Sequence, residues 1–131
     1  MKTSDSLKVG ELYTREALKQ EFRIKDATIY TGIFQPKGHD SVWLFVTEEK
    51  TPDRTQYQDR LDGDDLYIEG QESGRKDKLL IEHENGGLEI VLFFRKTRFE
   101  HDGAAFRYEG RFRYQGHRGT RPAKFHFRRI P

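Results

Sequence analysis

Apolar residues along this chain form one short helical pattern followed by runs of β-type alternation. Residues 14–22 begin with Thr14, a residue type that caps helices, and place Leu18 and Phe22 four positions apart on one face. Within residues 41–46, Val42, Leu44 and Val46 alternate with Trp43 and Phe45, so the segment is apolar on both faces, which is typical of a central strand. The pattern predicts one helix of about two to three turns and then β-structure.

Two further apolar runs predict a hairpin. Leu79–Glu82 and Leu88–Phe94 read as strands, and Glu84-Asn-Gly-Gly87 between them is typical of a hairpin turn. Residues 106–114 then alternate aromatic and charged side chains with a period of two. We expect this strand to bury its aromatic face and to expose its arginines, and Phe125 and Phe127 repeat the pattern near the C-terminus.

Short strands, glycine-rich turns and one early helix predict an α+β, mainly β fold resembling a barrel. The length of 131 residues suits a single domain over residues 1–131, and residues 1–6 are expected to be flexible. The chain has no cysteine, which excludes disulfides and thiolate zinc sites. No segment approaches the roughly 20 apolar residues of a membrane helix, so we expect a cytoplasmic protein without a membrane partner.

The net charge of +2 conceals a strong separation of charge along the chain. Residues 48–90 hold 13 acids and 6 bases, a net of −7, whereas residues 91–131 hold 11 bases and 3 acids, a net of +8. Nine of these 11 bases are arginine, which suits bidentate phosphate contacts and stacking on bases. This imbalance is typical of nucleic-acid binding, although a solvated strand face balanced by acidic loops would also produce it.

No motif for catalysis stands out. The histidines do not have the i, i+4 spacing of a helical metal pair, so neither a metal nor a cofactor is expected. His83-Glu-Asn85 is similar to part of an HNH nuclease motif but adjoins the predicted hairpin turn, without a ββα-metal unit around it. We therefore expect a binding protein and not an enzyme.

Residues 57–71 carry the most specific chemistry. Tyr57 and Asp59 precede an acidic turn at Asp62-Gly63-Asp64, a short apolar strand and Gly70. This order predicts a flat ring and a carboxylate near the mouth of a β-structure. Those are the groups needed to hold a flat heterocycle by its face and its polar edge.

The motif Tyr57-x-Asp59-x-x-Asp62-Gly63-Asp64, followed by Gly70-Gln71 and Gly74-Arg75, resembles the SRA (YDG) domains that read modified cytosine in DNA. The resemblance extends over about residues 7–129 and is closest to the divergent SRA-like modules of bacterial modification-dependent restriction proteins. It implies a PUA-like fold, which is a twisted, partly closed β-barrel with flanking helices. It also implies double-stranded DNA containing 5-methylcytosine or a related base as the partner, with a fused or separate HNH nuclease domain, at the bacterial nucleoid.

The resemblance implies that the modified base is flipped into a pocket. Tyr57 matches the tyrosine that stacks on the base, and Asp59 matches an acid that accepts from the exocyclic amine of cytosine. Where the family has Y-T-G this chain has Ile68-Glu69-Gly70, so Tyr67 or Trp43 is the candidate for a second stacking ring. Glu69 is a further candidate for the pocket wall. Arg60 stands where the commoner pattern has a second acid.

Basic residues near these loops are candidates for contacts with the DNA backbone, since most protein–DNA hydrogen bonds go to phosphate and sugar. The candidates are Arg54, Arg75, Lys76, Arg107, Arg111 and Arg113. A loop side chain must also fill the place that a flipped base leaves in the duplex. The candidates for this role are Gln35, His39, His117 and Arg118.

Two other functions fit the same residues. An RNA-binding PUA-like module would use the same basic face without a methyl-specific pocket. In a protein-interaction domain, Tyr57 and Asp59 would belong only to a strand and its turn.

Overall fold

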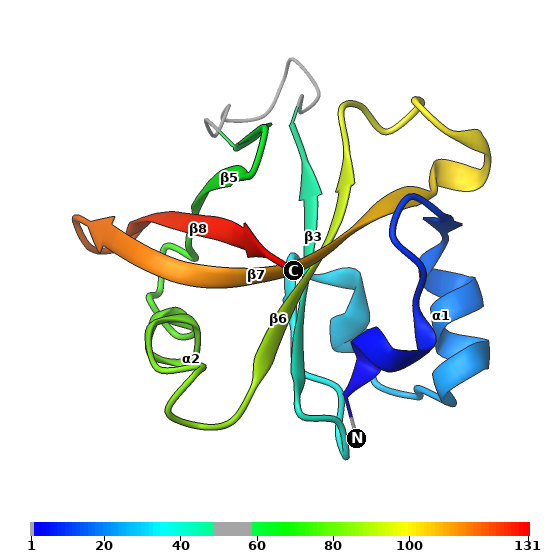
Figure 1. Cartoon of the computed structure of the whole chain (residues 1–131), viewed down its shortest axis with the longest axis horizontal. Helices are drawn as coiled ribbons and strands as arrows, with labels where there is room; N and C mark the ends of the chain where they lie inside the picture. Colours follow the sequence, from blue (N-terminus) through cyan, green and yellow to red (C-terminus); the bar gives the residue numbers. More distant parts are fainter. Residues whose placement is uncertain (1, 49–58) are drawn as a thin grey trace.

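A computed structural model describes residues 2–48 and 59–131, and it has a mixed α+β fold dominated by one sheet (Figure 1). The sheet has eight strands in the order β2-β3-β6-β7-β8-β5-β4, and β1 pairs with β7 outside this path. The strands are β1 (Leu12–Tyr13), β2 (Ile33–Phe34), β3 (Ser41–Thr47), β4 (Arg60–Asp62), β5 (Asp65–Glu69), β6 (Glu89–Arg95), β7 (Phe106–Arg118) and β8 (Lys124–Ile130). The α-helices are α1 (Arg15–Phe22) and α2 (Asp77–Ile81), and 3-10 helices span Thr3–Ser6, Ala27–Tyr30 and Asp102–Ala104.

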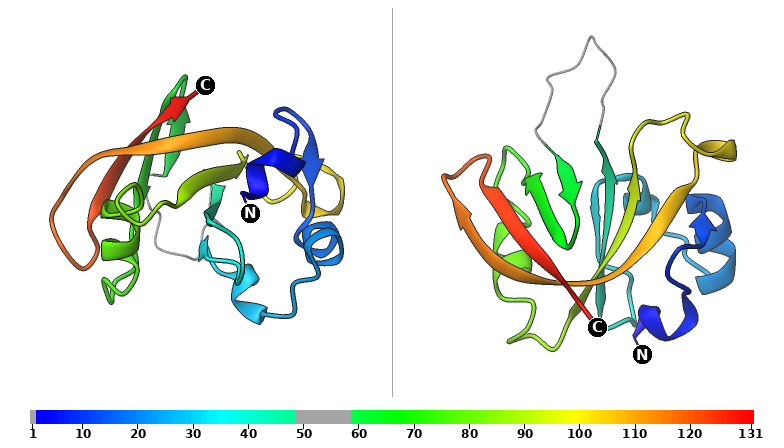
Figure 2. Two further views of the ribbon diagram at one scale, coloured as in Figure 1. Left: turned by 60° about the horizontal axis from the view of Figure 1, so that its bottom comes forward. Right: turned by 45° about the horizontal axis from the view of Figure 1, so that its top comes forward.

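The sheet is open and strongly curved. Within the described residues its path ends at β2 on one side and at β4 on the other, and no hydrogen-bonded pairing closes it. The long β7 bends across the molecule and pairs its second half with β8, which pairs with β5 on its other side (Figure 2). The expected α+β, mainly β class is confirmed, but the barrel is observed only as a curved open sheet.

The predicted helix over residues 14–22 is confirmed as α1. The Thr14 hydroxyl accepts a hydrogen bond from the Ala17 N–H at 3.0 Å and so caps the first turn. Arg23 ends the helix in the left-handed conformation with φ 54°. Leu18 is fully buried, so the helix packs through the face that its sequence predicts.

The predicted hairpin around residues 84–87 is wrong. Residues 77–81 form α2 instead of a strand, and β6 pairs in parallel with β3 through the register Ser41↔Glu89 to Thr47↔Arg95. A parallel pair requires a long crossover connection, and here it contains β4, β5 and α2. The apolar run at Leu79 to Ile81 is too short to distinguish a strand from a helical turn by its pattern alone.

Two cores lie on opposite faces of the central strands. The α1-side core is rich in aromatic residues and consists of Leu18, Ile29, Phe34, Trp43, Phe45, Val91, Phe93, Phe106 and Tyr108. The α2-side core lies on the other face and includes Val42, Leu44, Leu66, Leu80, Leu92, Phe112, Phe125 and Phe127. Figure 1 shows the two helices on opposite sides of β3 and β6. The prediction that residues 41–46 form a central strand is confirmed, because both cores bury β3.

Two β-bulges in β7 change which face its side chains occupy. The pairing with β6 shifts between Leu92↔Gly110 and Phe93↔Tyr108, and the pairing with β8 shifts between Tyr114↔Phe127 and Gly116↔His126. Each bulge adds one residue and so reverses the alternation that follows it. The prediction of one aromatic face and one arginine face along residues 106–114 is therefore wrong, since Tyr108 and Phe112 belong to different cores.

The N-terminal segment differs from the flexible segment expected over residues 1–6. Thr3 is fully buried, and its backbone N–H donates to the Ser41 hydroxyl at 3.0 Å. The Ser4 N–H and the Ser4 and Ser41 hydroxyls all donate to the Glu89 carboxylate at 2.5–2.9 Å. These hydrogen bonds fasten the first 3-10 helix to β3 and β6.

Candidate nucleic-acid interface

The outward side chains of β4, β5, β8 and the second half of β7 form a surface that we call the ladder face. Alternate residues of these strands are buried in the α2-side core, so the remaining ones point outward. Cross-strand pairing arranges them in three rows. Arg118, Lys124 and Glu69 form the first row; Gly116, His126, Tyr67 and Arg60 the second; Arg113, Arg128, Asp65 and Asp62 the third.

The second row is a stack of flat groups. The Tyr67 and His126 rings are 4.7 Å apart with an interplanar angle of 13°, and the Arg60 guanidinium carbon lies 4.5 Å from the centre of the Tyr67 ring. Because β4 and β8 flank β5 on opposite sides, Tyr67 lies between the guanidinium and the imidazole. Tyr67, a predicted base-stacking ring, therefore has both faces of its ring covered.

His126 is held in place by Asp65. Its Nε2 lies 2.8 Å from the Asp65 carboxylate, which is also 3.6 Å from the Arg128 guanidinium. The imidazole is therefore fixed between Tyr67 on one side and the position of Gly116 on the other. A cavity of about 360 Å³ lies along this part of the ladder face, and Arg60, His126, Arg118 and Lys124 are among its lining residues.

Arg118 and Lys124, in the first row of the ladder face, have no acidic partner within the described residues. Both are exposed, and neither side chain forms an ion pair or a hydrogen bond with that part of the chain. The other basic side chains of the face are engaged, since Arg60 lies over the Tyr67 ring, Arg128 lies near Asp65 and the Arg113 Nε donates to Glu84 at 3.0 Å. Arg118 and Lys124 are therefore suited to phosphate contacts.

Asp59 and Glu69 meet at a second cavity. The Asp59 carboxylate accepts a hydrogen bond from the Glu69 backbone N–H at 3.0 Å, which fixes the carboxylate at the end of β5. Both residues line a cavity of about 230 Å³ between the end of β5 and the strands β2 and β3. Its apolar lining comes from Ile33, Phe45, Val46 and Ile68.

The other predicted pocket residues do not join this pair. Trp43 is fully buried in the α1-side core, where its indole N–H donates to the Thr3 hydroxyl at 2.9 Å. Tyr67 lies on the ladder face, in the stack with Arg60 and His126. Tyr57 and Arg54 lie outside the described residues.

The predicted backbone-contact residues are dispersed over the molecule. Arg75 is exposed and Lys76 precedes α2, both on the segment that follows the Asp59 cavity. Arg107 lies 3.6 Å from the Glu109 carboxylate, Arg111 donates to the carbonyl of Pro131, and Arg113 pairs with Glu84. The expectation that Arg107, Arg111 and Arg113 line one face is wrong, because the bulge at Glu109 and Gly110 separates Arg107 from the other two.

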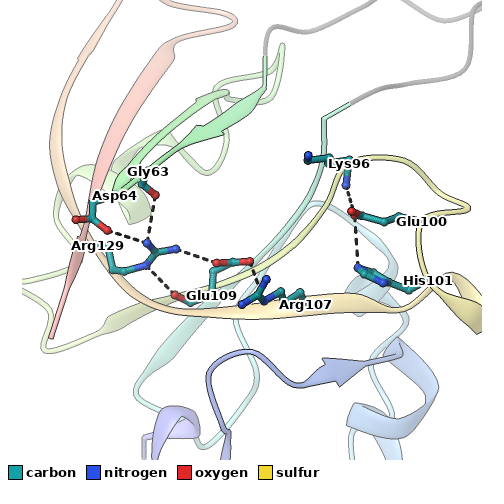
Figure 3. Close-up of polar contacts among 8 residues, drawn as sticks. All are labelled: Gly63, Asp64, Lys96, Glu100, His101, Arg107, Glu109 and Arg129. Carbon is teal, nitrogen blue, oxygen red and sulfur yellow. Dashed lines mark hydrogen bonds and ion pairs between the residues drawn. The ribbon is translucent and has the colours of Figure 1, made fainter.

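Figure 3 shows that Glu109, the partner of Arg107, also belongs to a network centred on Arg129. Arg129 donates to the Glu109 carboxylate at 2.8 Å, to the Glu109 carbonyl at 3.1 Å and to Asp64 at 2.7 Å. This network joins the bulge of β7 to β8 and to the turn between β4 and β5. The Lys96 N–H and His101 meet at Glu100 on the same side of the molecule.

Most of the histidine side chains form hydrogen bonds or ring contacts within the fold. His83 is buried, accepts from the Tyr114 N–H through Nε2 at 3.1 Å and uses Nδ1 for the Leu88 carbonyl at 2.9 Å. His39, a candidate for filling the vacated base position, contacts Thr3 through Nδ1 at 2.9 Å and packs against Phe22. Burial lowers the pKa of His39 below its ordinary value.

The remaining loop candidates lie apart from one another. Gln35 is exposed after β2, and His117 contacts the Tyr114 hydroxyl at 2.6 Å near the end of β7. Arg118 ends the same strand on the ladder face. His117 and Arg118 are therefore parts of β7 and not of a loop.

Residues 2–48 and 59–131 contain no cluster of three or more histidine or acidic side chains suited to a metal ion. No helix in the same ranges is both long and apolar enough to cross a bilayer. No model of a known protein family matches the chain, and a search of curated proteins found no match.

The sequence pattern did not identify the ladder as a site. Arg60 looked like a departure from the SRA motif, and His126 and Lys124 looked like the polar positions of a last strand. Alternation along the last strand predicts that His126 and Lys124 point away from the core. It does not predict which strands lie next to β8, because the pairing of β8 with β5 and β7 is long-range. The local β4–β5 hairpin pairs Arg60 with Tyr67, but only the long-range pairing of β8 with β5 adds His126 to the row.

Proposed function

We propose that this protein binds double-stranded DNA containing 5-methylcytosine or a related modified cytosine, and that it takes the modified base out of the stack into the Asp59 cavity. The observation that carries the proposal is the Asp59 carboxylate, held by the Glu69 N–H at the wall of a cavity that has apolar lining on one side. In this proposal the curved sheet is an SRA-like, PUA-related fold. The chain is a non-catalytic reader, suited to target a nuclease domain of a modification-dependent restriction system.

A fixed carboxylate discriminates cytosine from other pyrimidines. The exocyclic amine of cytosine donates a hydrogen bond, whereas uracil and thymine present a carbonyl oxygen at the same position. A carbonyl facing Asp59 would set two acceptors against each other, and such a mismatch costs about 1–3 kcal/mol, or more for a charged group. The orientation of Asp59 by a backbone N–H keeps this readout in place before the base arrives.

The apolar wall suits a methyl group. Ile33, Val46 and Ile68 offer aliphatic surface beside the carboxylate. Burying one methyl group contributes about 0.8 kcal/mol. Extrusion of a base costs a few kcal/mol of lost stacking and pairing. Tyr57, ten residues after Thr47 and two before Asp59, is proposed to return part of this cost by stacking on the base.

The ladder face adjoins this cavity, because Glu69 lines both. Arg118 and Lys124 replace the dispersed arginines of β7 as proposed contacts to the DNA backbone. Arg75 and Lys76 keep that role beside the cavity. Such contacts position the duplex without reading its sequence, and they make the affinity depend on salt.

The test compares methylated, hydroxymethylated and unmodified duplexes with a matched RNA at two salt concentrations. Asp59→Asn preserves an oxygen that accepts from the Glu69 N–H but removes the carboxylate charge. We expect this variant to lose the preference for the modified duplex while keeping its thermal unfolding temperature. Asp62→Asn is the matched control, since it makes the same change on β4 away from the cavity.

Equal affinity of the natural protein for methylated and unmodified duplexes at both salt concentrations would overturn the proposal. A preference that survives in Asp59→Asn would show that another group reads the base. Tighter binding of the matched RNA would favour an RNA-binding module, for which the stacked row on the ladder face is the supporting observation.

A further inference from the structure

The stacked row on the ladder face ends at a residue without a side chain. Arg60, Tyr67 and His126 occupy three successive positions of the row, and Gly116 occupies the fourth. A Cβ atom added to Gly116 would meet no heavy atom within 4 Å, so the space above this glycine is open. Gly116 faces outward because Gln115 is the extra residue of the second bulge.

We propose that an unpaired nucleobase binds in this fourth position, stacked on the face of His126 that is turned away from Tyr67. The base would continue the stack that Tyr67 and His126 already form at a ring separation of 4.7 Å. Histidine rings and arginine guanidiniums are common partners of splayed-out bases, and such stacking tolerates all four bases. The chemistry recognised is a nucleobase with its adjacent phosphate in a single strand.

The charges of the ladder face favour a phosphate at this end of the row. Arg118 and Lys124 lie in the neighbouring row at the β7 and β8 positions, and neither has an acidic partner within the described residues. The acids of the face lie on β4 and β5: Glu69 is the β5 neighbour of Lys124 in the first row, and Asp65 and Asp62 lie in the third row. A phosphate next to a base above Gly116 would therefore meet cations on β7 and β8.

Asp65 does not offset the positive charge of Arg118 and Lys124, because its carboxylate already has partners. Its carboxylate is engaged by His126 at 2.8 Å and lies 3.6 Å from Arg128, so it orients the imidazole that the base would contact. Glu84 similarly pairs with Arg113 in the third row. The proposal is independent of the Asp59 cavity, because it uses the outward side of β7 and β8 and needs no flipped base.

The test measures binding of single-stranded deoxyribonucleotide and ribonucleotide octamers of the same sequence. An abasic octamer of equal charge reports the contribution of phosphate alone. We expect the natural protein to bind both base-containing octamers at least about fivefold more tightly than the abasic one, in keeping with about 1–3 kcal/mol for one stacked base. The comparison of DNA with RNA identifies the source of the strand.

Gly116→Leu is the decisive variant, since its side chain enters the open position, its Cβ meets no heavy atom within 4 Å and the backbone there is not left-handed. We expect it to bring the affinity for base-containing octamers down to that for the abasic octamer. Thr120→Leu, in the exposed turn after β7, adds a similar apolar side chain outside the row and should leave binding unchanged. His126→Phe should keep most of the binding and His126→Leu should lose it, which tests the stack even if Gly116→Leu fails to fold.

Two results would overturn this proposal: equal affinity of the natural protein for base-containing and abasic octamers, or unchanged octamer binding in Gly116→Leu. The methyl preference for duplex DNA, measured in the same variants, separates this proposal from the proposed function. Gly116→Leu should keep that preference, and Asp59→Asn should keep octamer binding. If the protein shows no methyl preference but its octamer binding depends on Gly116, the stacking site is supported and the proposed base-flipping function is rejected.

Discussion

The two halves of β7 share one feature and have different surroundings. Each half contains a bulge next to a glycine, Gly110 in the first and Gly116 in the second. The first half, around Phe106 to Gly110, packs against the α1-side core and the Arg129 network. The second half, around Tyr114 to Arg118, lies beyond the end of its pairing with β6 and faces solvent on its outer side. The difference teaches that the neighbouring strands, and not the local pattern, decide whether an arginine is engaged or available.

Gly110 in the first half of β7 and Gly116 in the second half also have different surroundings. Gly110 has φ 98°, a conformation that side chains rarely adopt, and a Cβ there would lie 3.5 Å from Val9. Gly116 has open space around it and no such backbone requirement. The first glycine is needed by the fold, whereas the second leaves an opening on a surface.

The largest expected effect comes from removing an aromatic ring in each half. Phe106→Ala should lower the free energy of unfolding by about 3–5 kcal/mol, because the ring is 1% exposed and supports the Arg95 guanidinium at 4.0 Å. Tyr114→Ala should cost less, since Tyr114 is only half-buried. Urea unfolding of both variants measures the difference. Equal costs would mean that the two halves contribute alike to the fold.

The Arg129 network gives the next effect. Glu109→Ala should lower the free energy of unfolding by about 1.5–3 kcal/mol, because Arg129 loses the carboxylate it contacts at 2.8 Å. Arg118→Ala in the second half should leave stability within about 0.5 kcal/mol. Chemical denaturation provides the comparison, and a strongly destabilised Arg118→Ala variant would contradict the assignment of Arg118 as an unengaged cation.

Glycine substitutions sharpen the contrast further. Gly110→Ala should cost about 1–3 kcal/mol, since alanine must adopt a strained backbone conformation. Gly116→Ala should change stability by less than about 0.5 kcal/mol. The measurement is again the free energy of unfolding. If both glycines tolerate alanine equally, the first bulge does not constrain β7 in the way described.

The smallest expected effect is a pH dependence located at the α1-side core. Burial lowers the pKa of His39, so the folded state binds a proton less readily than the unfolded state. Neutral His39 therefore makes its full contribution to the free energy of unfolding above the ordinary histidine pKa of about 6.5. This contribution is lost as the pH falls below that value. His39→Gln should flatten the decrease in unfolding temperature between about pH 7 and pH 5. A steeper decrease in the variant would contradict the sign of this effect.

Sequence reasoning predicted the elements whose signals are local. Thr14 as a cap, Leu18 on the buried face of α1 and the central strand around Trp43 all follow from short-range patterns, and the structure confirms them. It failed at Leu79 to Ile81, where three apolar residues fit a strand and a helical turn equally well. It also took Trp43 for a pocket candidate, although the tryptophan is part of the α1-side core.

Sequence reasoning likewise identified some residues of the candidate site and missed others. Asp59 was identified from the order of Tyr57, Asp59 and the acidic turn, and it does lie at a cavity with Glu69. Tyr67 was identified as an aromatic residue near that motif, but its ring is enclosed by Arg60 and His126. Arg60 faces Tyr67 across the β4–β5 hairpin, but His126 is 59 positions away along the chain, so no local pattern could place it against the ring.

The order of amino acids alone therefore established a mainly β protein with one early helix, an arginine-rich second half and a ring-and-carboxylate motif. These properties depend on alternation and composition, which are readable residue by residue. The tertiary structure decided which arginines are engaged, which aromatic rings are covered and where Gly116 leaves an opening. Those outcomes depend on two bulges and on the long-range register of β5, β7 and β8, because shifting a strand by one residue moves every side chain to its other face.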